Sequence, residues 1–308
     1  MKENLGLSRK VKDIAESFCS KPNEISIAVV NLKTSEPEIS GYNMENFMYP
    51  ASIYKIFIAA EILRQIDSGQ RNLDDLVKIE SINVNDKENP KFFPKTTRVD
   101  HRPLLKDGDL VTVDYLLDLM LTRSDNTASN VLLDVADRES INNHIILPNN
   151  WNGSEVTRKF LDRLKEQKEY RVSKITVSNT RHLVEFFCRV DSNQMVNQWV
   201  SGKLKEYMLK LNNSNKKGLY IPEFLEYYCK GGWLEVNGYK WNVWRGIKSV
   251  YQKGYAIIRY SGDTGVVTGK NSHYAIAVLT ITKTKWPWVK FPMEKLSKQI
   301  HDLMESRQ

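Results

Sequence analysis

The chain has 308 residues, of which 41 % are hydrophobic and 27 % charged, and its formal net charge is +8. This is the composition of an ordinary globular protein, and the length allows one large domain or two lobes. Basic residues are mixed with acidic ones, and no apolar run reaches the ~18 residues of a membrane-spanning helix. The sequence therefore predicts no nucleic-acid partner and no membrane span.

Cysteine and histidine are sparse. The three cysteines, Cys19, Cys188 and Cys229, are too scattered for a disulfide framework, and no cysteine or histidine has the spacing of a metal site. We therefore expect no metal and no cofactor. The first ten residues lack the apolar core of a signal peptide. The chain as written is thus expected in the cytoplasm, or outside it if a leader was removed.

The first third of the chain begins with an amphipathic pattern that predicts a helix over about residues 8–19. A run rich in β-branched residues, Glu24–Leu32, predicts a strand. A turn containing Pro37 follows, and Glu38–Tyr42 is the expected hairpin partner of that strand.

Tyr49–Lys55 precedes a strongly apolar segment that predicts a mostly buried helix ending near residues 67–69. Ser52 falls at the helix N-terminus and Lys55 lies one turn further along the same face. A serine hydroxyl needs a neighbouring base to act as a nucleophile, and burial disfavours the charged form of a lysine. Free N–H groups at a helix N-terminus also stabilise a developing anion. The alternative is an N-capping serine with a solvated lysine.

The middle of the chain is predicted to be mainly helical. Residues 80–110 show no periodicity and are expected to form a long surface excursion, after which residues 111–121 predict a helix with Thr112 as its cap. Ser124-Asp125-Asn126 interrupts two apolar helical patterns and is expected on a short connection, where it could also be a simple capping turn. Further helices are predicted near 154–169 and 178–190.

The last third changes to strand patterns separated by glycines, followed by a closing helix over residues 291–308. The predicted strands cover residues 225–233, 248–259, 265–268 and 274–281. The order of elements predicts an α/β (α+β) fold with an antiparallel sheet of about five strands flanked by the N- and C-terminal helices. Residues 1–50 and 191–308 would form this lobe. Residues 51–190 would be an inserted all-helical lobe, with the site in a cleft between the two.

These motifs resemble those of the serine β-lactamase and penicillin-binding superfamily, most closely its class A-like branch. That family carries S-x-x-K, S-D-N and K-T-G. Ser52-Ile53-Tyr54-Lys55 matches the first motif and Ser124-Asp125-Asn126 the second. The residues around both motifs are also similar, and the resemblance covers most of the chain. It is weakest over residues 80–110 and 235–260.

The third motif is less clear. Lys230-Gly231-Gly232 lies about one hundred residues after Ser124, as the family spacing implies, and Trp233 follows it. Lys253-Gly254 is the rival candidate. Neither offers the hydroxyl that K-T-G supplies for a substrate carboxylate. The alternative without a functional role is that Lys230 is a solvated lysine at a glycine-rich hairpin corner.

The deacylation base departs furthest from the family pattern. Class A enzymes use a loop glutamate that activates water. Glu166 is the better candidate here and Glu169 the other, but the family's Glu-x-x-x-Asn spacing is missing. Both glutamates could instead be solvated surface charges.

The resemblance implies a serine hydrolase that acts on an amide or ester through an acyl-enzyme. Ser52 would be the nucleophile, Lys55 the general base and Ser124 the proton relay. Asn126 would hold the substrate amide, Lys230 would supply positive potential, and the Ser52 and Trp233 N–H groups, beside Gly232, would form an oxyanion hole.

The expected partner is a small-molecule amide or ester, which can also carry a carboxylate, and the expected oligomeric state is a monomer. β-Lactamase-like hydrolysis is the first functional prediction. A D-Ala-D-Ala peptidase (penicillin-binding protein), or a cytoplasmic acylase or esterase of a biosynthetic pathway with slow β-lactam turnover, is the second. A non-catalytic binding module is the third, and the intact Ser52, Lys55, Ser124 and Asn126 argue against it.

Overall fold

The computed structural model describes residues 1–18, 25–80, 82–83, 102–157, 176–210, 219, 226–237, 257–284 and 291–306. The chain divides into two compact units. Unit 1 comprises Met1–Ile53, Asn179–Cys188 and Lys217–Gln308, and unit 2 comprises Tyr54–Ser178 and Arg189–Lys216. The sequence analysis placed the lobe boundaries after residues 50 and 190. In the structure the chain passes from unit 1 to unit 2 after Ile53, and residues 189–216 belong to unit 2.

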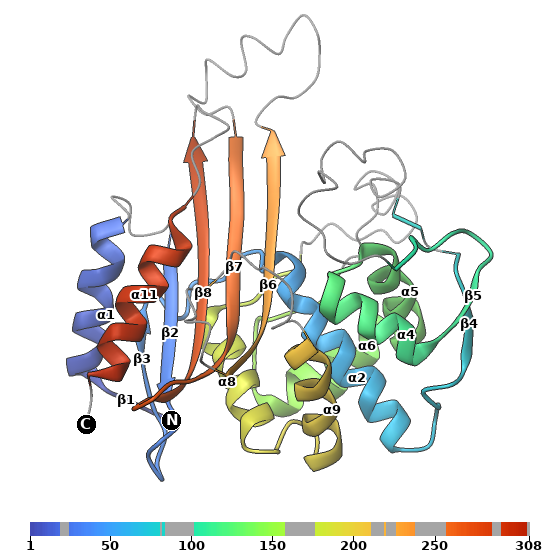
Figure 1. Cartoon of the computed structure of the whole chain (residues 1–308), viewed down its shortest axis with the longest axis horizontal. Coiled ribbons are helices and arrows are strands. Elements are labelled where there is room, and N and C mark those ends of the chain that lie inside the picture. Colours follow the sequence, from blue (N-terminus) through green and yellow to red (C-terminus); the bar gives the residue numbers. More distant parts are fainter. Residues whose placement is uncertain are drawn as a thin grey trace, which may run out of the picture. The chain divides into compact units, whose positions relative to one another are not determined.

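Unit 1 is built on a sheet whose strands come from both ends of the chain (Figure 1). Its order is β1-β3-β2-β8-β7-β6, and every neighbouring pair is antiparallel except the short parallel pair β1–β3. The predicted mixed fold with a mostly antiparallel sheet is confirmed, with six described strands instead of about five. The strands are β1 Lys2–Glu3, β2 Ile25–Asn31, β3 Glu38–Tyr42, β6 Glu226–Asn237, β7 Ile257–Thr268 and β8 His273–Thr284.

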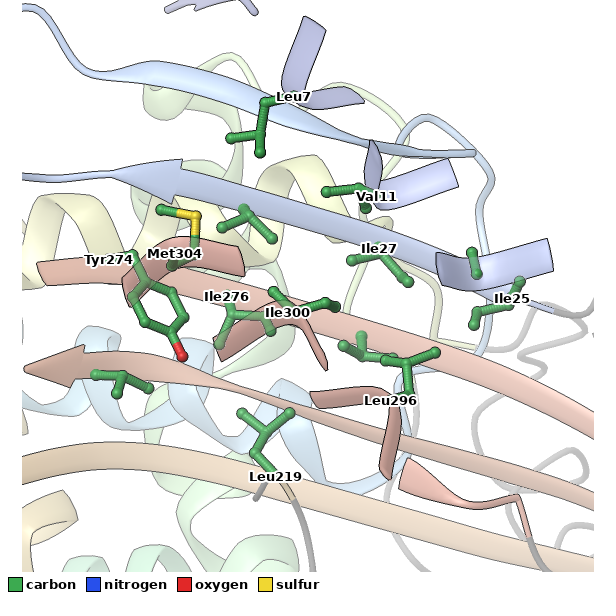
Figure 2. Close-up of a cluster of buried hydrophobic side chains, with 14 residues drawn as sticks. Leu7, Val11, Ile25, Ile27, Leu219, Tyr274, Ile276, Leu296, Ile300 and Met304 are labelled. Atoms are coloured by element: carbon green, nitrogen blue, oxygen red, sulfur yellow. The ribbon is translucent and has the colours of Figure 1, made fainter. Parts of the chain in front are cut away.

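The two terminal helices, α1 (Leu5–Phe18) and α11 (Met293–Glu305), lie together on one face of this sheet (Figure 1). Both are amphipathic, so each buries an apolar stripe against the strands. Figure 2 shows Leu296, Ile300 and Met304 of α11 directed toward sheet side chains such as Ile276. The predicted N- and C-terminal flanking helices are confirmed, and this cluster is the core of unit 1.

The other face of the sheet contacts α8 (Thr180–Asp191), where the ring of Phe187 lies 6.0 Å from that of Tyr228 on β6. Side chains alternate between faces along a strand. Lys230 and Gly232 therefore share the α8-facing side with Tyr228. Gly231 and Trp233 share the opposite side with Tyr227, which packs against the core cluster of α1 and α11.

Unit 2 is largely helical, and α2 (Lys55–Asp67) contacts α5, α6 and α9 within it (Figure 1). Residues Lys55–Leu63 are all buried, as expected for a helix that is apolar on nearly every side. A 3-10 turn, η2 (Ala51–Tyr54), leads directly into α2. The other elements are β4 Leu76–Lys78, β5 Leu110–Thr112, α4 Val113–Asp118, η3 Leu119–Arg123, α5 Asn126–Ala136, α6 Arg138–Ile141, η4 Asn142–Ile146, η5 Leu147–Asn149 and α9 Gln198–Leu209.

Gln65 links α2 to the end of α5 beside a buried carboxylate, that of Glu61. Glu61 is fully buried and accepts hydrogen bonds from Arg64 Nε and Nη2 at 2.7 and 2.8 Å. Gln65 Nε2 donates to Glu61 Oε1 at 2.8 Å and to the carbonyl of Ala136 at 2.9 Å. The hydrogen bond to Glu61 also raises the pKa of Arg64.

The structure differs from the sequence-based elements in several places. β7 runs unbroken through residues 257–268, where two shorter strands were predicted. The helix predicted near 154–169 is wrong at its start, since Glu155 forms a β-bridge with Val177, and its remainder lies outside the described residues. β4, β5 and α9 were not predicted. The helix over 111–121 is confirmed in part, and Thr112 caps α4 by accepting from the N–H of Tyr115.

None of the helices in the described part of the chain combines the length and apolar character needed to cross a membrane.

A buried histidine makes the stability of unit 1 dependent on pH. Burial, partly offset by the charge of Glu45, lowers the pKa of His182 from 6.5 to about 4. Between these pH values the unfolded chain binds a proton that the folded chain does not. The free energy of unfolding should therefore fall by about 1–2 kcal/mol as the pH drops from 6.5 to 4.

Urea unfolding of the wild type and of His182→Gln at pH 7 and pH 4.5 measures this contribution. Between pH 7 and pH 4.5, the free energy of unfolding of the wild type should fall by more than that of His182→Gln. If the difference is the same at both pH values, His182 does not titrate as its environment indicates.

Candidate active site

Ser52 is the accessible residue of an otherwise buried turn. In the segment Ala51–Lys55, every other residue is at most 2 % exposed, whereas Ser52 is half-buried. Ala51 has a φ of 50°, a left-handed conformation that is uncommon outside glycine, and the N–H of Ile53 donates to the carbonyl of Pro50 at 3.1 Å. The turn therefore presents one hydroxyl at the entrance to α2, as the S-x-x-K spacing predicted.

Within unit 1, the backbone of β6 comes very close to this turn at Gly232. A Cβ atom at position 232 would lie 2.5 Å from the backbone nitrogen of Ser52, 3.0 Å from that of Ile53 and 3.1 Å from the Cβ of Ala51. No side chain fits at such distances. Gly232 thus lets the strand backbone lie against the Ser52 amide, and the structure brings these two predicted site residues together.

Trp233 follows Gly232 on β6, which lies at the edge of the sheet formed by the described strands. Its side chain is 57 % exposed and lies on the sheet face of α1 and α11, opposite to the face of Gly232. Of Trp233, therefore, only the backbone N–H belongs to the stretch of β6 that passes Ser52.

Lys230 is 2 % exposed and lies on the same face of β6 as Gly232. Its Nζ donates to the carbonyl of Gly231 at 3.0 Å. The alternative considered from the sequence, that Lys230 is solvated, is therefore wrong, because its side chain is buried. The rival third-motif residue, Lys253, lies outside the described residues.

In unit 2, the amine of Lys55 is fully buried and faces the S-D-N loop. Its Nζ donates to the carbonyl of Ser124 at 2.7 Å and to the hydroxyl of Ser124 at 3.2 Å. It also donates to Asn126 Oδ1 at 2.9 Å and to the carbonyl of Asp125 at 3.3 Å. The alternative that Lys55 is solvated is likewise wrong. The structure brings together Lys55, Ser124 and Asn126, three of the residues predicted from the two motifs.

The conformation of the S-D-N loop follows from the helix ends that it joins. Ser124 ends the π-helical turn η3 with φ 57° and ψ 37°, a left-handed conformation. Asp125 then begins α5 by accepting from the N–H of Ala128 at 2.8 Å, and its other oxygen accepts from Arg123 Nη2 at 2.8 Å. The capping turn considered from the sequence is thus present. It is also what turns both oxygens of Ser124 toward Lys55.

Two further expectations concern other groups. The candidate deacylation residues Glu166 and Glu169 lie outside the described residues. In the part of the chain that the structure describes, no three His, Cys, Asp or Glu side chains are grouped so that they could hold a metal ion.

One residue near the third motif was missed by the sequence analysis. A Cβ atom at Gly231 would lie 3.3 Å from the carboxylate carbon of Asp263 on β7. The only signal in the sequence was the glycine-rich stretch 261–265 that contains it, which indicated a strand break instead of a neighbour of Gly231.

Each unit thus holds its own group of candidate residues. In unit 1, the backbone nitrogens of Ser52 and Ile53 lie next to Gly232 on β6. In unit 2, the buried amine of Lys55 is within hydrogen-bond distance of the Ser124 hydroxyl, an arrangement that can move a proton.

Comparison with known proteins places the whole chain in a family. The sequence matches the Beta-lactamase enzyme family over residues 6–304. Among curated protein sequences, none matches this chain.

Solved structures share the fold over nearly the full length. The structure of PBP-A has a TM-score of 0.69 at 14 % identity, and the match covers 98 % of this chain and 97 % of the PBP-A chain. The TLA-1 extended spectrum β-lactamase has a TM-score of 0.69 at 15 % identity, with coverages of 97 % and 99 %. A β-lactamase from Chitinophaga pinensis DSM 2588 has a TM-score of 0.68 at 15 % identity, with coverages of 96 % and 98 %.

At these identities the structural likeness establishes the fold alone, whereas the family match extends over almost the whole sequence. The chain belongs to the β-lactamase enzyme family, within the superfamily of serine β-lactamases and penicillin-binding proteins, and is a serine β-lactamase-like hydrolase.

Proposed function

We propose that this protein is a class A-like serine hydrolase that cleaves an amide or ester through an acyl-enzyme on Ser52, most closely in the manner of a β-lactamase. The observation that carries the proposal is the buried amine of Lys55. It lies 3.2 Å from the hydroxyl of Ser124 and follows Ser52 by one helical turn.

In the first step Ser52 Oγ attacks the carbonyl carbon of the substrate and its proton passes to the neutral amine of Lys55. The resulting oxyanion accepts hydrogen bonds from the backbone N–H groups of Ser52 and Trp233. Each such donor can contribute about 3 kcal/mol to the stability of the transition state. The close contact between Gly232 and the Ser52 amide supports this part of the proposal.

The tetrahedral intermediate then expels its leaving group. Ser124 passes a proton to that group and is reprotonated by Lys55, with which it shares a hydrogen bond. Asn126, which already contacts Lys55 through Oδ1, binds the amide of the substrate. Lys230 adds positive potential that favours deprotonation of Ser124.

Hydrolysis of the ester on Ser52 completes the cycle. A water molecule attacks the acyl carbon, and its proton goes to a carboxylate, for which Glu166 is the first candidate and Glu169 the second. If neither acts, the acyl-enzyme is long-lived and the protein behaves as a penicillin-binding protein. Because Gly231 lacks the hydroxyl of the K-T-G motif, we keep the penicillin-binding protein as the second candidate function.

Replacement of the nucleophile should abolish acylation. We expect Ser52→Ala to show no mass increase after incubation with a penicillin, because the change removes the hydroxyl that attacks in the proposed mechanism. Intact-mass spectrometry measures this, and Ser35→Ala, at an exposed turn, is the matched control. Labelling of the Ser52→Ala protein would contradict the assignment.

The lifetime of the adduct on the wild type distinguishes the two candidate functions. A hydrolase should return to its unmodified mass once the substrate is consumed, whereas a penicillin-binding protein should remain acylated.

The base can be tested by replacing the amine. Lys55→Arg introduces a permanent cation that cannot accept a proton at neutral pH, and Lys55→Met removes the amine. Both should lower the rate of acylation by about 10²–10⁴-fold, the usual contribution of a general base. Stopped-flow or quenched mass measurements give this rate. Acylation by Lys55→Arg at the wild-type rate would show that Lys55 does not take the proton.

The close approach of β6 to the nucleophile predicts that Gly232→Ala is severe. The added methyl group must displace Ser52 or the strand, so acylation should fall by at least about 10²-fold. Gly202→Ala on α9 is the matched control, since a Cβ atom there meets nothing within 4 Å. Thermal unfolding of both variants shows whether the fold is kept, and an equal effect on acylation in both would contradict the prediction.

A further inference from the structure

The serine of the second motif has a backbone conformation that must be held by its surroundings. Ser124 has φ 57° and ψ 37°, a region that is uncommon outside glycine. A residue stays in such a conformation only when neighbouring contacts fix it there. In this conformation the carbonyl and the hydroxyl of Ser124 both accept from Lys55 Nζ, at 2.7 and 3.2 Å. Relaxation of the backbone at Ser124 would therefore separate the hydroxyl from the amine.

The two residues that flank Ser124 are joined to each other through their side chains. Arg123 Nη2 and Nε both donate to Asp125 Oδ2, at 2.8 and 3.2 Å. The two side chains are only 3 % and 5 % exposed, and charge-assisted hydrogen bonds are the stronger kind. Because these bonds connect the residues before and after Ser124, they restrain the backbone of Ser124 from both ends.

Both partners of this ion pair are anchored to other segments. The second oxygen of Asp125, Oδ1, accepts from the N–H of Ala128 at the start of α5. Arg123 Nη1 donates to the carbonyls of Arg102 and Pro103 at 2.8 and 3.3 Å, and Nη2 donates to that of Pro103 at 3.2 Å. One planar guanidinium thus joins residues 102–103 to the S-D-N loop, and a lysine ammonium lacks the fork that allows this.

The segment that receives Arg123 is itself bound to the helical turn that ends at Arg123. Arg102 Nη2 donates to Thr122 Oγ1 at 2.8 Å, and Arg102 Nη1 pairs with Asp118. Thr122 Oγ1 donates in turn to the carbonyl of Asp118 at 2.5 Å, and Asp118 lies 3.4 Å from Lys210 Nζ on α9. All of these residues belong to unit 2. The contacts of Arg123 therefore form part of a closed network that braces the loop.

We propose that Arg123 is a positioning residue for the proton relay, which acts by holding Ser124 in the conformation that keeps its hydroxyl beside Lys55. This inference rests on the proposed acyl-enzyme function of Ser52. In the step concerned, the C–N bond of an amide or lactam breaks and the nitrogen takes the proton of Ser124 Oγ. Ser124 then regains a proton from the ammonium of Lys55. Loss of the brace should therefore slow the release of leaving groups that need a proton.

The test compares two acylating probes that differ in this need. The amine released from benzylpenicillin must be protonated, whereas the nitrophenolate of p-nitrophenyl acetate leaves as an anion. Quenched intact-mass spectrometry gives the first rate and nitrophenolate release gives the second, each corrected for the Ser52→Ala protein. Ser124→Ala supplies the reference pattern, because it removes the relay itself. Its rate should fall at least about 10²-fold with benzylpenicillin and at most about threefold with the ester.

Arg123→Met should reproduce this pattern in a weaker form. We expect the benzylpenicillin rate to fall at least about tenfold and the ester rate to fall at most about threefold. Partial unfolding would lower both rates alike, so the ratio of the two rates separates positioning from a loss of stability. An equal loss with both probes, or no loss with either, overturns the proposal.

Arg71→Met is the matched control. Arg71 also joins two segments of unit 2, since its Nε donates to Gln65 Oε1 and its Nη2 to the carbonyl of Val135, both at 2.8 Å. These contacts lie at the far ends of α2 and α5 from Lys55 and Asn126. The ratio of rates should stay at its wild-type value, and thermal unfolding of both arginine variants is compared. A ratio that falls as far in Arg71→Met as in Arg123→Met overturns the proposal.

Arg123→Lys tests the guanidinium fork and replaces Arg123→Met if that variant does not fold. It keeps a positive charge next to Asp125, but a single ammonium cannot reproduce the fork geometry. The ratio of the benzylpenicillin rate to the ester rate should therefore fall at least about threefold. A wild-type ratio in Arg123→Lys overturns the proposal.

The outcomes separate this inference from the function on which it rests. If benzylpenicillin does not acylate Ser52 of the wild type, the proposed function fails and the inference fails with it. If benzylpenicillin acylates Ser52 and the ratio in Ser124→Ala is that of the wild type, only the inference fails. The same holds if the ester does not acylate the wild type, because its leaving group needs no relay.

Discussion

The burial of one amine governs the arrangement of unit 2. A lysine taken out of water must have its donors satisfied, and Lys55 has oxygens of Ser124, Asp125 and Asn126 within hydrogen-bond distance. The loop before α5 meets this requirement with a left-handed conformation at Ser124, in which both its carbonyl and its hydroxyl accept from Lys55.

Much of the fold was predictable because burial and strand periodicity leave a clear pattern. The strands near residues 25–31 and 273–284 and the helix α2 follow apolar runs of the expected length, and α1 follows an amphipathic pattern. β7 was misjudged because its glycines were taken for turn signals. In the structure Gly262 and Gly265 are required by close packing instead: a Cβ atom would lie 2.5 Å from Leu279 Cδ2 at one and 2.3 Å from the carbonyl of Tyr228 at the other. The short strands β4 and β5 are largely exposed and have too little pattern to detect.

The candidate site was predictable where the chain itself sets the spacing. Ser52 and Lys55 are one helical turn apart, so their relation is local. The contact between Lys55 and Ser124 joins residues 69 positions apart and was inferred from the family motifs, not from any local pattern. Asp263 shows the limit of this approach, because cross-strand register decides that it faces Gly231, and one residue of slippage would place it on the other face of the sheet.

The left-handed backbone of Ser124 sets a course for laboratory evolution of this protein. Serine is disfavoured in that conformation and glycine is not, so Ser124→Gly should relieve strain in the folded state. The same change deletes the hydroxyl that touches Lys55. A library sorted for heat resistance alone would thus drift toward inactive sequences at this codon, and only a screen that also demands turnover would retain the serine.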